Sequence, residues 1–258
     1  MYKITDLYDL EKTYPLAAEE FSGLTYAWEM IPKIKELFDL EHSKAGQYLA
    51  GFTYPWEALA GISDLILEIG KTLPEDEYHH PTDWDGKVLE DVWVANDATV
   101  FKTAYLHGPC IIGHKTEVRQ CAFVRGSALV GDNCVVGNST ELKNVILFDN
   151  VQVPHYNYVG DSILGYKAHM GAGSITSNVK SDKLPVVVKD GEMQHETVRK
   201  KVGAMLGDRV EVGCNSVLNP GTIVGRDSNV YPTSCVRGVV PPRSIWKDKD
   251  NIVEKEEK

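Results

Sequence analysis

The sequence predicts a mainly β protein, a parallel β-helix of hexapeptide repeats with a small helical unit before it. Two observations predict this fold. Apolar residues recur at every sixth position from Val94 to Phe148 without a miss, and the same spacing returns from Leu206 to Val236. The residues between these positions are mostly small, polar or charged. A period of six fits neither an amphipathic helix nor a single strand, and it indicates an internal repeat in which three hexads form one coil. Residues 18 apart should then stack at the inter-strand spacing of about 4.8 Å.

The first 86 residues have a different pattern and are predicted to form a helical domain and a linker. Apolar residues recur at helical spacing from Ala27 to Phe38, and again from Leu59 to Ile69 after a helix start at Pro55. A shorter helix is predicted around residues 5–22. The aromatic side chains of this domain are interpreted as its core. The polar residues 75–81, with the His79–His80 pair, are interpreted as a solvated loop.

Residues 87–245 are predicted to form the β-helix. Its spacing shortens by one residue between Phe148 and Val153, and again between Val159 and Leu164. The repeat stops at Asn178, and a strand followed by an Asp-Gly pair predicts a β-hairpin insertion at about 182–199. The remaining residues, 246–258, are expected to be a charged, frayed C-terminal tail.

Composition limits the classes of partner. The formal net charge of -10 argues against a nucleic-acid-binding protein, which would carry a basic patch. No run of 18 apolar residues is present, and the N-terminus lacks the apolar core of a signal peptide. The odd number of cysteines, five, is typical of buried free thiols in a reducing compartment. We therefore expect a cytoplasmic protein with neither nucleic-acid nor membrane partners.

The 18-residue stacking rule places three side chains in one column. His107, Arg125 and Lys143 are each 18 residues apart, and each follows an inward apolar residue. Two cations on adjacent rungs repel each other, so the arrangement is favourable if an anion such as a phosphate lies over them. The alternative interpretation is that both side chains simply extend into water.

Other candidate residues lie close to this column in the predicted fold. Glu141 precedes Lys143 by two residues and should project to the same side, and His155 and Tyr158 follow one coil later. A histidine with a pKa near neutrality is the usual general base, although a lone histidine is more often structural. The small residues from Gly171 to Asn178 allow a ligand to approach the backbone, but tight corners need small residues too.

These motifs also carry a resemblance. The matching stretches are Val124–Gly126, Glu141–Lys143, His155–Asp161, Gly171–Asn178 and Arg199–Asp208, and they keep the family spacing. Together they resemble the acetyltransferase domain of the bifunctional glucosamine-1-phosphate acetyltransferase and N-acetylglucosamine-1-phosphate uridyltransferase family, especially its archaeal sugar-1-phosphate variants. The resemblance covers roughly residues 90–240. It implies a left-handed β-helix, a homotrimer, acetyl-CoA as cosubstrate and no metal requirement for acetyl transfer.

The resemblance implies a set of substrate-binding residues. Arg125, Lys143 and Tyr158 match positions that hold the sugar phosphate. Lys201 matches a further phosphate contact, which the family trimer supplies across the subunit boundary. His169 stands where the family has an asparagine that contacts the sugar, so the identity of the sugar is left open.

The resemblance also implies catalytic and coenzyme-binding residues. His155 matches the base that deprotonates the sugar amine, and Glu141 matches its supporting carboxylate. Ala172 and Asn178 match positions along the acetyl-CoA arm. Cys214 falls where the family often has a serine near the thioester, which keeps a small side chain without the hydroxyl.

Three functional hypotheses follow. The first is an acetyl-CoA-dependent N-acetyltransferase of nucleotide-sugar biosynthesis that acts on an amino-sugar 1-phosphate. Uridylyl transfer is expected to be absent, because the Gly-rich loop of the family's nucleotide-binding half has no counterpart here. The second is a non-catalytic trimer that senses a sugar phosphate or a nucleotide sugar. The third, a β-helix carbonic anhydrase with three histidines on zinc, is disfavoured because His107 and His114 are seven apart and should lie on different faces.

Overall fold

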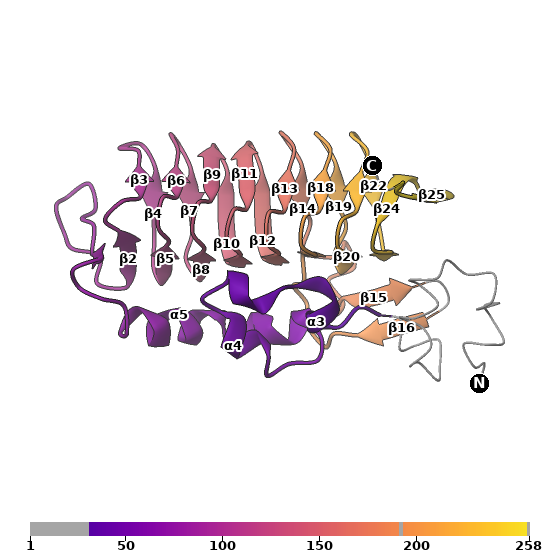
Figure 1. Ribbon diagram of the computed structural model, residues 1–258, viewed down its shortest axis with the longest axis horizontal. Coiled ribbons are helices and arrows are strands. Elements are labelled where there is room, and N and C mark those ends of the chain that lie inside the picture. The colour runs from indigo at the N-terminus through magenta and orange to yellow at the C-terminus, as the bar shows by residue number, and fades with distance from the viewer. Residues whose placement is uncertain (1–30, 191–192, 257–258) are drawn as a thin grey trace.

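The computed structural model describes residues 31–190 and 193–256. It confirms the parallel β-helix, which is a prism whose three faces are built from parallel strands; two of the faces are joined into one sheet by β10 (Glu141–Leu147) and β12 (Tyr158–Leu164) (Figure 1). Face A is the face that carries the helical segment. Its strands are β2 (Val92–Ala95), β5 (Cys110–Ile112), β8 (Ala128–Val130), the second halves of β10 and β12, β17 (Ala204–Leu206), β20 (Thr222–Val224) and β23 (Val239–Val240).

The other two faces follow in each coil. Face B contains β4 (Tyr105–Leu106), β7 (Phe123–Val124), the first halves of β10 and β12, β14 (Ile175–Thr176), β19 (Val217–Leu218) and β22 (Cys235–Val236). Face C contains β3 (Thr99–Val100), β6 (Glu117–Val118), β9 (Val135–Asn138), β11 (Gln152–His155), β13 (His169–Met170), β18 (Glu211–Val212), β21 (Asn229–Val230) and β24 (Ser244–Asp248).

The strand register confirms the stacking rule. Val94 pairs with Ile112, and Ile112 pairs with Val130, each 18 residues further on. All three side chains are buried. The apolar residue of each hexad therefore forms the core of the prism, and burying it is the main stabilising contribution.

The first shortening of the repeat lies one step earlier than the sequence predicted. Leu147, and not Phe148, is in register with Val130, so the short interval runs from Leu142 to Leu147. The second predicted interval, from Val159 to Leu164, is confirmed. The periodicity assigned Phe148 to the hexad position because its side chain is apolar. Its ring instead packs against Phe38 of the helical segment, at 5.1 Å between ring centroids.

At both shortened intervals, one strand continues from face B around the corner onto face A. The corner residues of β10 and β12 are Asn144 and Asp161, and both have positive φ angles, 55° and 49°. Asparagine and aspartate tolerate this left-handed conformation better than most residues. The two polar side chains are thereby fixed at the same edge on neighbouring coils.

The helical segment covers face A (Figure 1). It contains α3 (Ile34–Leu37), the 3₁₀ helix η2 (Leu40–His42), α4 (Gly46–Leu49), the 3₁₀ helix η3 (Pro55–Ala60) and α5 (Ile62–Gly70). This cover explains why every residue of β8 is buried, since its outward side chain Leu129 would otherwise be exposed.

The helical predictions are confirmed in part. The helix expected at 59–69 is present as α5, preceded by η3. Of the helix expected at 27–38, the described residues contain only the short α3. The helix expected at 5–22 lies outside the described residues, as do Ala27 and Met30.

Three other expectations are corrected. The supposed loop at 75–81 contains β1 (Tyr78–His79), which pairs antiparallel with β2. The tail that was expected to be frayed contains most of β24 and all of β25 (Asn251–Glu254), and these two strands form an antiparallel pair. It is ordered because Trp246 is 4% exposed and continues the core of the prism. The five cysteines are free, but only two are buried; Cys121, Cys214 and Cys235 are exposed.

The predicted hairpin insertion is confirmed. Its strands, β15 (Val187–Asp190) and β16 (Met193–Glu196), are antiparallel. The Val202 N–H donates to the Asn178 carbonyl at 3.0 Å and closes the neck where the insertion leaves and rejoins the coil. His195 packs against the rings of Tyr54 and Trp56, which stack at 4.7 Å, so the helical segment holds the hairpin.

Candidate functional site

The predicted column exists on face B. The inward residues that precede His107, Arg125 and Lys143 are paired in register on adjacent coils. However, the two cations are not left to repel each other. Arg125 Nη1 donates to Glu141 Oε1 at 2.6 Å, and Lys143 Nζ lies 3.0 and 3.1 Å from the two carboxylate oxygens of Asp161. The stacking of two cations therefore does not by itself require a bound anion.

The two ion pairs differ in exposure. The side chains of Arg125 and Glu141 are 47% and 30% exposed, whereas the Asp161 side chain is only 3% exposed. The hydrogen bond and charge of Glu141 raise the pKa of Arg125 above its ordinary value. A ligand can thus displace Glu141 from Arg125 more easily than it can displace the buried Asp161 from Lys143.

Asp161 is the centre of a polar network at the corner between faces B and A. Besides Lys143, its carboxylate accepts hydrogen bonds from Asn144 Nδ2 at 3.0 Å and Asn178 Nδ2 at 2.6 Å. Asn144 Nδ2 also donates to the carbonyl of Leu59 in η3, at 3.2 Å. The network therefore connects the helical segment to face B.

Asp161 was missed as a functional residue in the sequence. It lies at the end of the His155–Asp161 motif. The sequence feature that pointed to it was the position of its carboxylate, one coil after Asn144 in the shortened part of the repeat. Its burial could not be inferred, because it depends on Lys143, Asn178 and η3 closing over the corner together.

Tyr158 and Asn178 lie beside this network. Tyr158 is in register with Glu141 on the neighbouring coil, as predicted, and its hydroxyl accepts a hydrogen bond from Asn178 Nδ2 at 3.2 Å. Burial, together with the negative charge of Asp161, raises the pKa of Tyr158. Asn178 therefore lies beside the predicted phosphate-binding residues. Ala172 precedes strand β14 and Asn178 follows it, so these two predicted coenzyme residues lie at opposite ends of that strand.

His155 lies at the other edge of face B, at the end of strand β11 on face C. It is in register with Asn138 and is exposed. Its imidazole makes no hydrogen bond or ion pair within the described ranges, and the predicted supporting carboxylate, Glu141, is bonded to Arg125 instead. A ligand can therefore approach the imidazole from solvent.

Asn157 is a second residue that sequence reasoning missed. Its side chain is 2% exposed, and its Oδ1 accepts from the His155 N–H at 3.1 Å. Its Nδ2 donates to the carbonyls of Gly171 and Ser174 at 2.9 and 3.1 Å. Asn157 thereby fixes the backbone of His155 relative to the Gly171–Ser174 turn on the next coil.

The predicted coenzyme residues Ala172 and Cys214 lie on adjacent coils. The Asn215 N–H donates to the Ala172 carbonyl at 2.8 Å. The N–H groups of Gly171 and Gly173 are occupied by the carbonyls of Val212 and His155, at 2.7 and 3.0 Å. In contrast, the Ala172 N–H has no acceptor within the part of the chain that the structure describes, so it can donate to a ligand.

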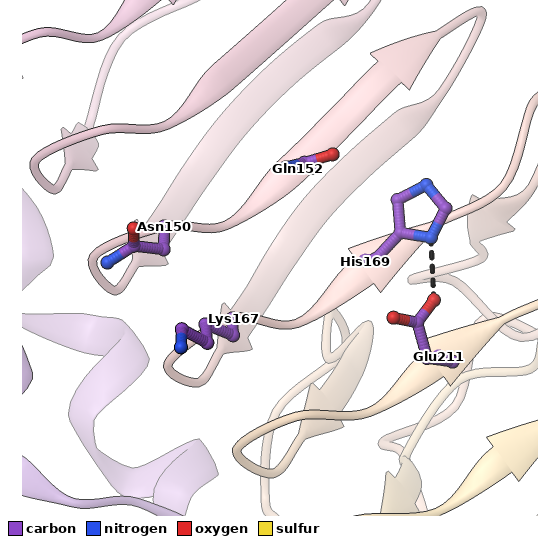
Figure 2. A pocket seen from close by; sticks show the side chains of 5 residues that line it. All are labelled: Asn150, Gln152, Lys167, His169 and Glu211. Atoms are coloured by element: carbon purple, nitrogen blue, oxygen red, sulfur yellow. Dashed lines mark hydrogen bonds and ion pairs between the residues drawn. The ribbon is translucent and has the colours of Figure 1, made fainter.

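The structure does not bring His169 to this cluster. His169 lies on face C, where its Nδ1 is 2.7 Å from Glu211 Oε2. This pair lines a pocket of about 320 Å³ together with Asn150, Gln152 and Lys167. Figure 2 shows the five side chains and the contact between His169 and Glu211. Lys201 is exposed at the neck of the hairpin insertion, one residue before Val202.

The described residues contain neither a metal-binding cluster nor a membrane-spanning helix. Among residues 31–190 and 193–256, no group of three or more His, Cys, Asp or Glu side chains is placed to hold a metal ion. No helix within the same ranges is long and apolar enough to span a membrane.

Comparison with protein families decides the classification. The family model for the GMPPB C-terminal domain matches residues 106–253, more than half of the chain. The chain belongs to the GMPPB C-terminal domain family. The matched range of this GMPPB C-terminal domain begins at Leu106 in β4 and includes His155 and both ion pairs of the cluster.

Curated relatives agree with the resemblance found in the sequence. The chain is similar to the bifunctional protein GlmU of Methanococcus maripaludis, with 35% identity over 132 residues, which are 51% of this chain and 32% of the relative. It is 29% identical over 184 residues to GlmU of Methanococcus aeolicus, covering 64% and 44% of the two chains. A Nostoc GlmU is 38% identical over 160 residues, covering 62% and 31%. The chain thus spans between about a third and less than half of the length of these relatives.

The solved structures to which the chain is similar are more distant in sequence. The acetyltransferase domain of PglB from Neisseria gonorrhoeae, in complex with acetyl coenzyme A, has a TM-score of 0.35 at 16% identity, covering 66% of this chain and 59% of that chain. PerB from Caulobacter crescentus, in complex with CoA and GDP-perosamine, has a TM-score of 0.33 at 17% identity, covering 76% and 67%.

Proposed function

We propose that this protein is an acetyl-CoA-dependent N-acetyltransferase whose substrate is an amino sugar with a phosphate on its anomeric carbon, such as an amino-sugar 1-phosphate. The observation that carries the proposal is the gathering of Arg125, Glu141, Lys143 and Tyr158 on one face, with His155 exposed at the edge of that face. The similarity to GlmU over the same region supports it.

In this proposal the phosphate binds between Arg125 and Lys143. Phosphate oxygens accept charge-assisted hydrogen bonds from both side chains, and the Tyr158 hydroxyl adds a donor. The partly exposed Glu141 gives up its contact with Arg125, while Asp161 keeps Lys143 in position. Lys201 adds a further positive charge, from a neighbouring subunit if the chain forms the homotrimer that the resemblance implies.

His155 acts as the general base. The sugar amine reacts in its neutral form, because an ammonium group has no free electron pair; its extra proton is first lost to solvent. His155 then removes one proton from the amine as the nitrogen attacks the thioester carbonyl carbon. The resulting tetrahedral intermediate collapses, the carbon–sulfur bond breaks, and the protonated imidazole returns the proton to the departing thiolate. The products are an N-acetyl sugar phosphate and free CoA.

The coenzyme is assigned to the coils that carry Ala172 and Cys214. The Ala172 N–H, which has no acceptor among the described residues, can stabilise the negative charge that develops on the thioester oxygen. Asn157 keeps this turn and His155 at a fixed spacing. The small side chains of Ala172 and Cys214 leave room for the pantetheine arm.

The test is thiol release from acetyl-CoA against a panel of amino-sugar 1-phosphates. Turnover with one sugar is expected, and His155→Ala should reduce kcat about 100- to 10,000-fold, the usual range for losing a general base. Replacing the neighbouring exposed Tyr156 with alanine is the matched control and should leave kcat unchanged. Loss of the oligomer in His155→Ala would instead indicate a structural role for this histidine.

One observation favours a second function, a non-catalytic sensor of sugar phosphates or nucleotide sugars. Both cations already have carboxylate partners, and no carboxylate orients His155 within the described residues. In that case calorimetry would detect sugar-phosphate binding by the wild type while no panel member released thiol.

A further inference from the structure

A pair of exposed aromatic rings continues the site along the β-helix, toward its N-terminal end. The Tyr105 and Phe123 side chains are 49% and 41% exposed, and their ring centroids are 5.6 Å apart. Single exposed aromatic residues are common on protein surfaces, whereas these two are adjacent and form one contiguous aromatic surface. These two rings have no role in the acetyl-transfer mechanism proposed above.

The rings share a column with the polar cluster. Tyr105 is in register with Phe123, Phe123 with Glu141, and Glu141 with Tyr158. With rungs about 4.8 Å apart, Tyr105 lies about 10 Å from Glu141 along the axis. Phe123 therefore lies on the same rung as Arg125, and Tyr105 lies one rung further toward the N-terminal end.

Arg125 joins the two regions. Its guanidinium lies over the Phe123 ring at 5.9 Å from the centroid and also donates to Glu141. A ligand that carries an anionic group at Arg125 thus meets an aromatic surface on the N-terminal side. Ala172 and Cys214, the proposed coenzyme residues, lie on coils toward the C-terminal end.

This order limits the chemistry of the ligand. If the amine lies at His155 and the anomeric phosphate at Arg125 and Lys143, only a group attached to that phosphate can reach Phe123 and Tyr105. An amino-sugar 1-phosphate ends at the cations and has no such group. A nucleoside diphosphate adds a second phosphate and a flat base, which stacks on aromatic side chains and on arginine.

We propose that Phe123 and Tyr105 form a stacking site for a nucleobase, so that the substrate of this site is a nucleoside-diphosphate amino sugar. This inference rests on the proposed function for the position of the amine, but base stacking can be tested without acetyl transfer. The charge pattern fits one ligand with two parts, its phosphates on the cationic side and its base on the rings.

The test is calorimetric titration of the full chain with UDP and with GDP, using pyrophosphate as the probe that lacks a base. We expect at least one nucleoside diphosphate to bind about tenfold more tightly than pyrophosphate, and we expect Phe123→Ala to remove this difference while the affinity for pyrophosphate is unchanged. Phe123→Leu, which keeps an apolar side chain of similar size, should remove the difference as well, and it provides the answer if the alanine variant does not fold.

Tyr231 offers a matched control. It is a 46% exposed aromatic residue with a lysine, Lys247, over its ring at 6.0 Å, but it lies outside the column. Tyr231→Ala should leave the nucleotide affinity unchanged. Equal affinities for nucleoside diphosphates and pyrophosphate in the wild type would overturn the inference. So would sedimentation showing that Phe123→Leu dissociates an oligomer, because a second copy would then cover the rings.

The two proposals fail separately. Base-dependent binding without thiol release from any amino-sugar donor would refute acetyl transfer and leave the stacking site standing. Equal turnover of an amino-sugar 1-phosphate by the wild type and Phe123→Leu, with no preference for a nucleotide-linked form, would refute the stacking site and leave acetyl transfer standing.

Discussion

The Asp161 carboxylate lies 3.0 and 3.1 Å from the Lys143 ammonium, and both oxygens are also hydrogen-bonded to asparagine amides from other coils. Because Asp161 is buried, this pair has a fixed geometry that the exposed pair of Arg125 and Glu141 lacks. The site therefore combines one cation held in place with one that a ligand can recruit.

The first prediction compares these two pairs. Asp161→Ala should lower the free energy of unfolding by about 2–3 kcal/mol, because Lys143, Asn144 and Asn178 all lose an acceptor in a partly buried site. Glu141→Ala should cost less than about 1 kcal/mol, as expected for an exposed ion pair. Urea unfolding of the two variants measures both values, and equal losses would contradict the assignment of Asp161 as the centre of the network.

The second prediction concerns phosphate affinity. Lys143→Ala should weaken binding of an amino-sugar 1-phosphate about tenfold, which corresponds to about 1.4 kcal/mol, since a charge-assisted hydrogen bond is lost. Replacing the exposed Lys102 with alanine is the control for a general loss of positive charge. Calorimetry well below the unfolding temperature of each variant measures the dissociation constants. An unchanged constant for Lys143→Ala would remove this residue from the phosphate site.

The third prediction concerns the hairpin insertion, whose His195 packs against Trp56 of the helical segment at 5.1 Å between centroids. Trp56 is 2% exposed, so Trp56→Ala should cost about 3–5 kcal/mol. His195→Ala should cost much less, because β16 is at the surface. Both variants should increase hydrogen exchange in β15 and β16. Unaltered exchange there would show that the helical segment does not hold the hairpin.

The fourth prediction is a pH dependence of stability. Lys44 of the helical segment forms an ion pair with Asp132 of the β-helix. Burial acts to lower the pKa of Lys44, but the hydrogen bond and charge of Asp132 outweigh it, so the pKa is raised above 10.5. A raised lysine pKa contributes stability that is fully present below pH 10.5 and is lost as the pH rises through the folded-state value.

Thermal unfolding of the wild type and Lys44→Met from about pH 9 to about pH 12 tests this sign. The wild type should be the more stable protein at the lower end, and the difference should shrink as the pH rises. Lys71→Met, at an exposed position after α5, should show no such trend. A difference that grows with pH would contradict the assigned ion pair.

Much of the fold follows from the spacing of apolar residues. Because Val94, Ile112 and Val130 belong to a series of apolar residues with a period of six, which a repeated coil can bury, the prism and its register were predictable. The same arithmetic placed Arg125 beside Lys143, and the Asp190–Gly191 pair marked the hairpin. The similarity of the His155 and Lys143 motifs to a known family could also be recognised from sequence.

The tertiary structure alone decided which groups become partners. The periodicity treated Phe148 as a core residue of the prism, whereas its ring meets Phe38, which is distant in sequence. The sequence suggested that an anion relieves the repulsion of the stacked cations, but Glu141 and Asp161 already do so. The physical reason is that a repeat fixes which residues stack, while burial and charge pairing depend on side chains that the helical segment and neighbouring coils bring to the same corner.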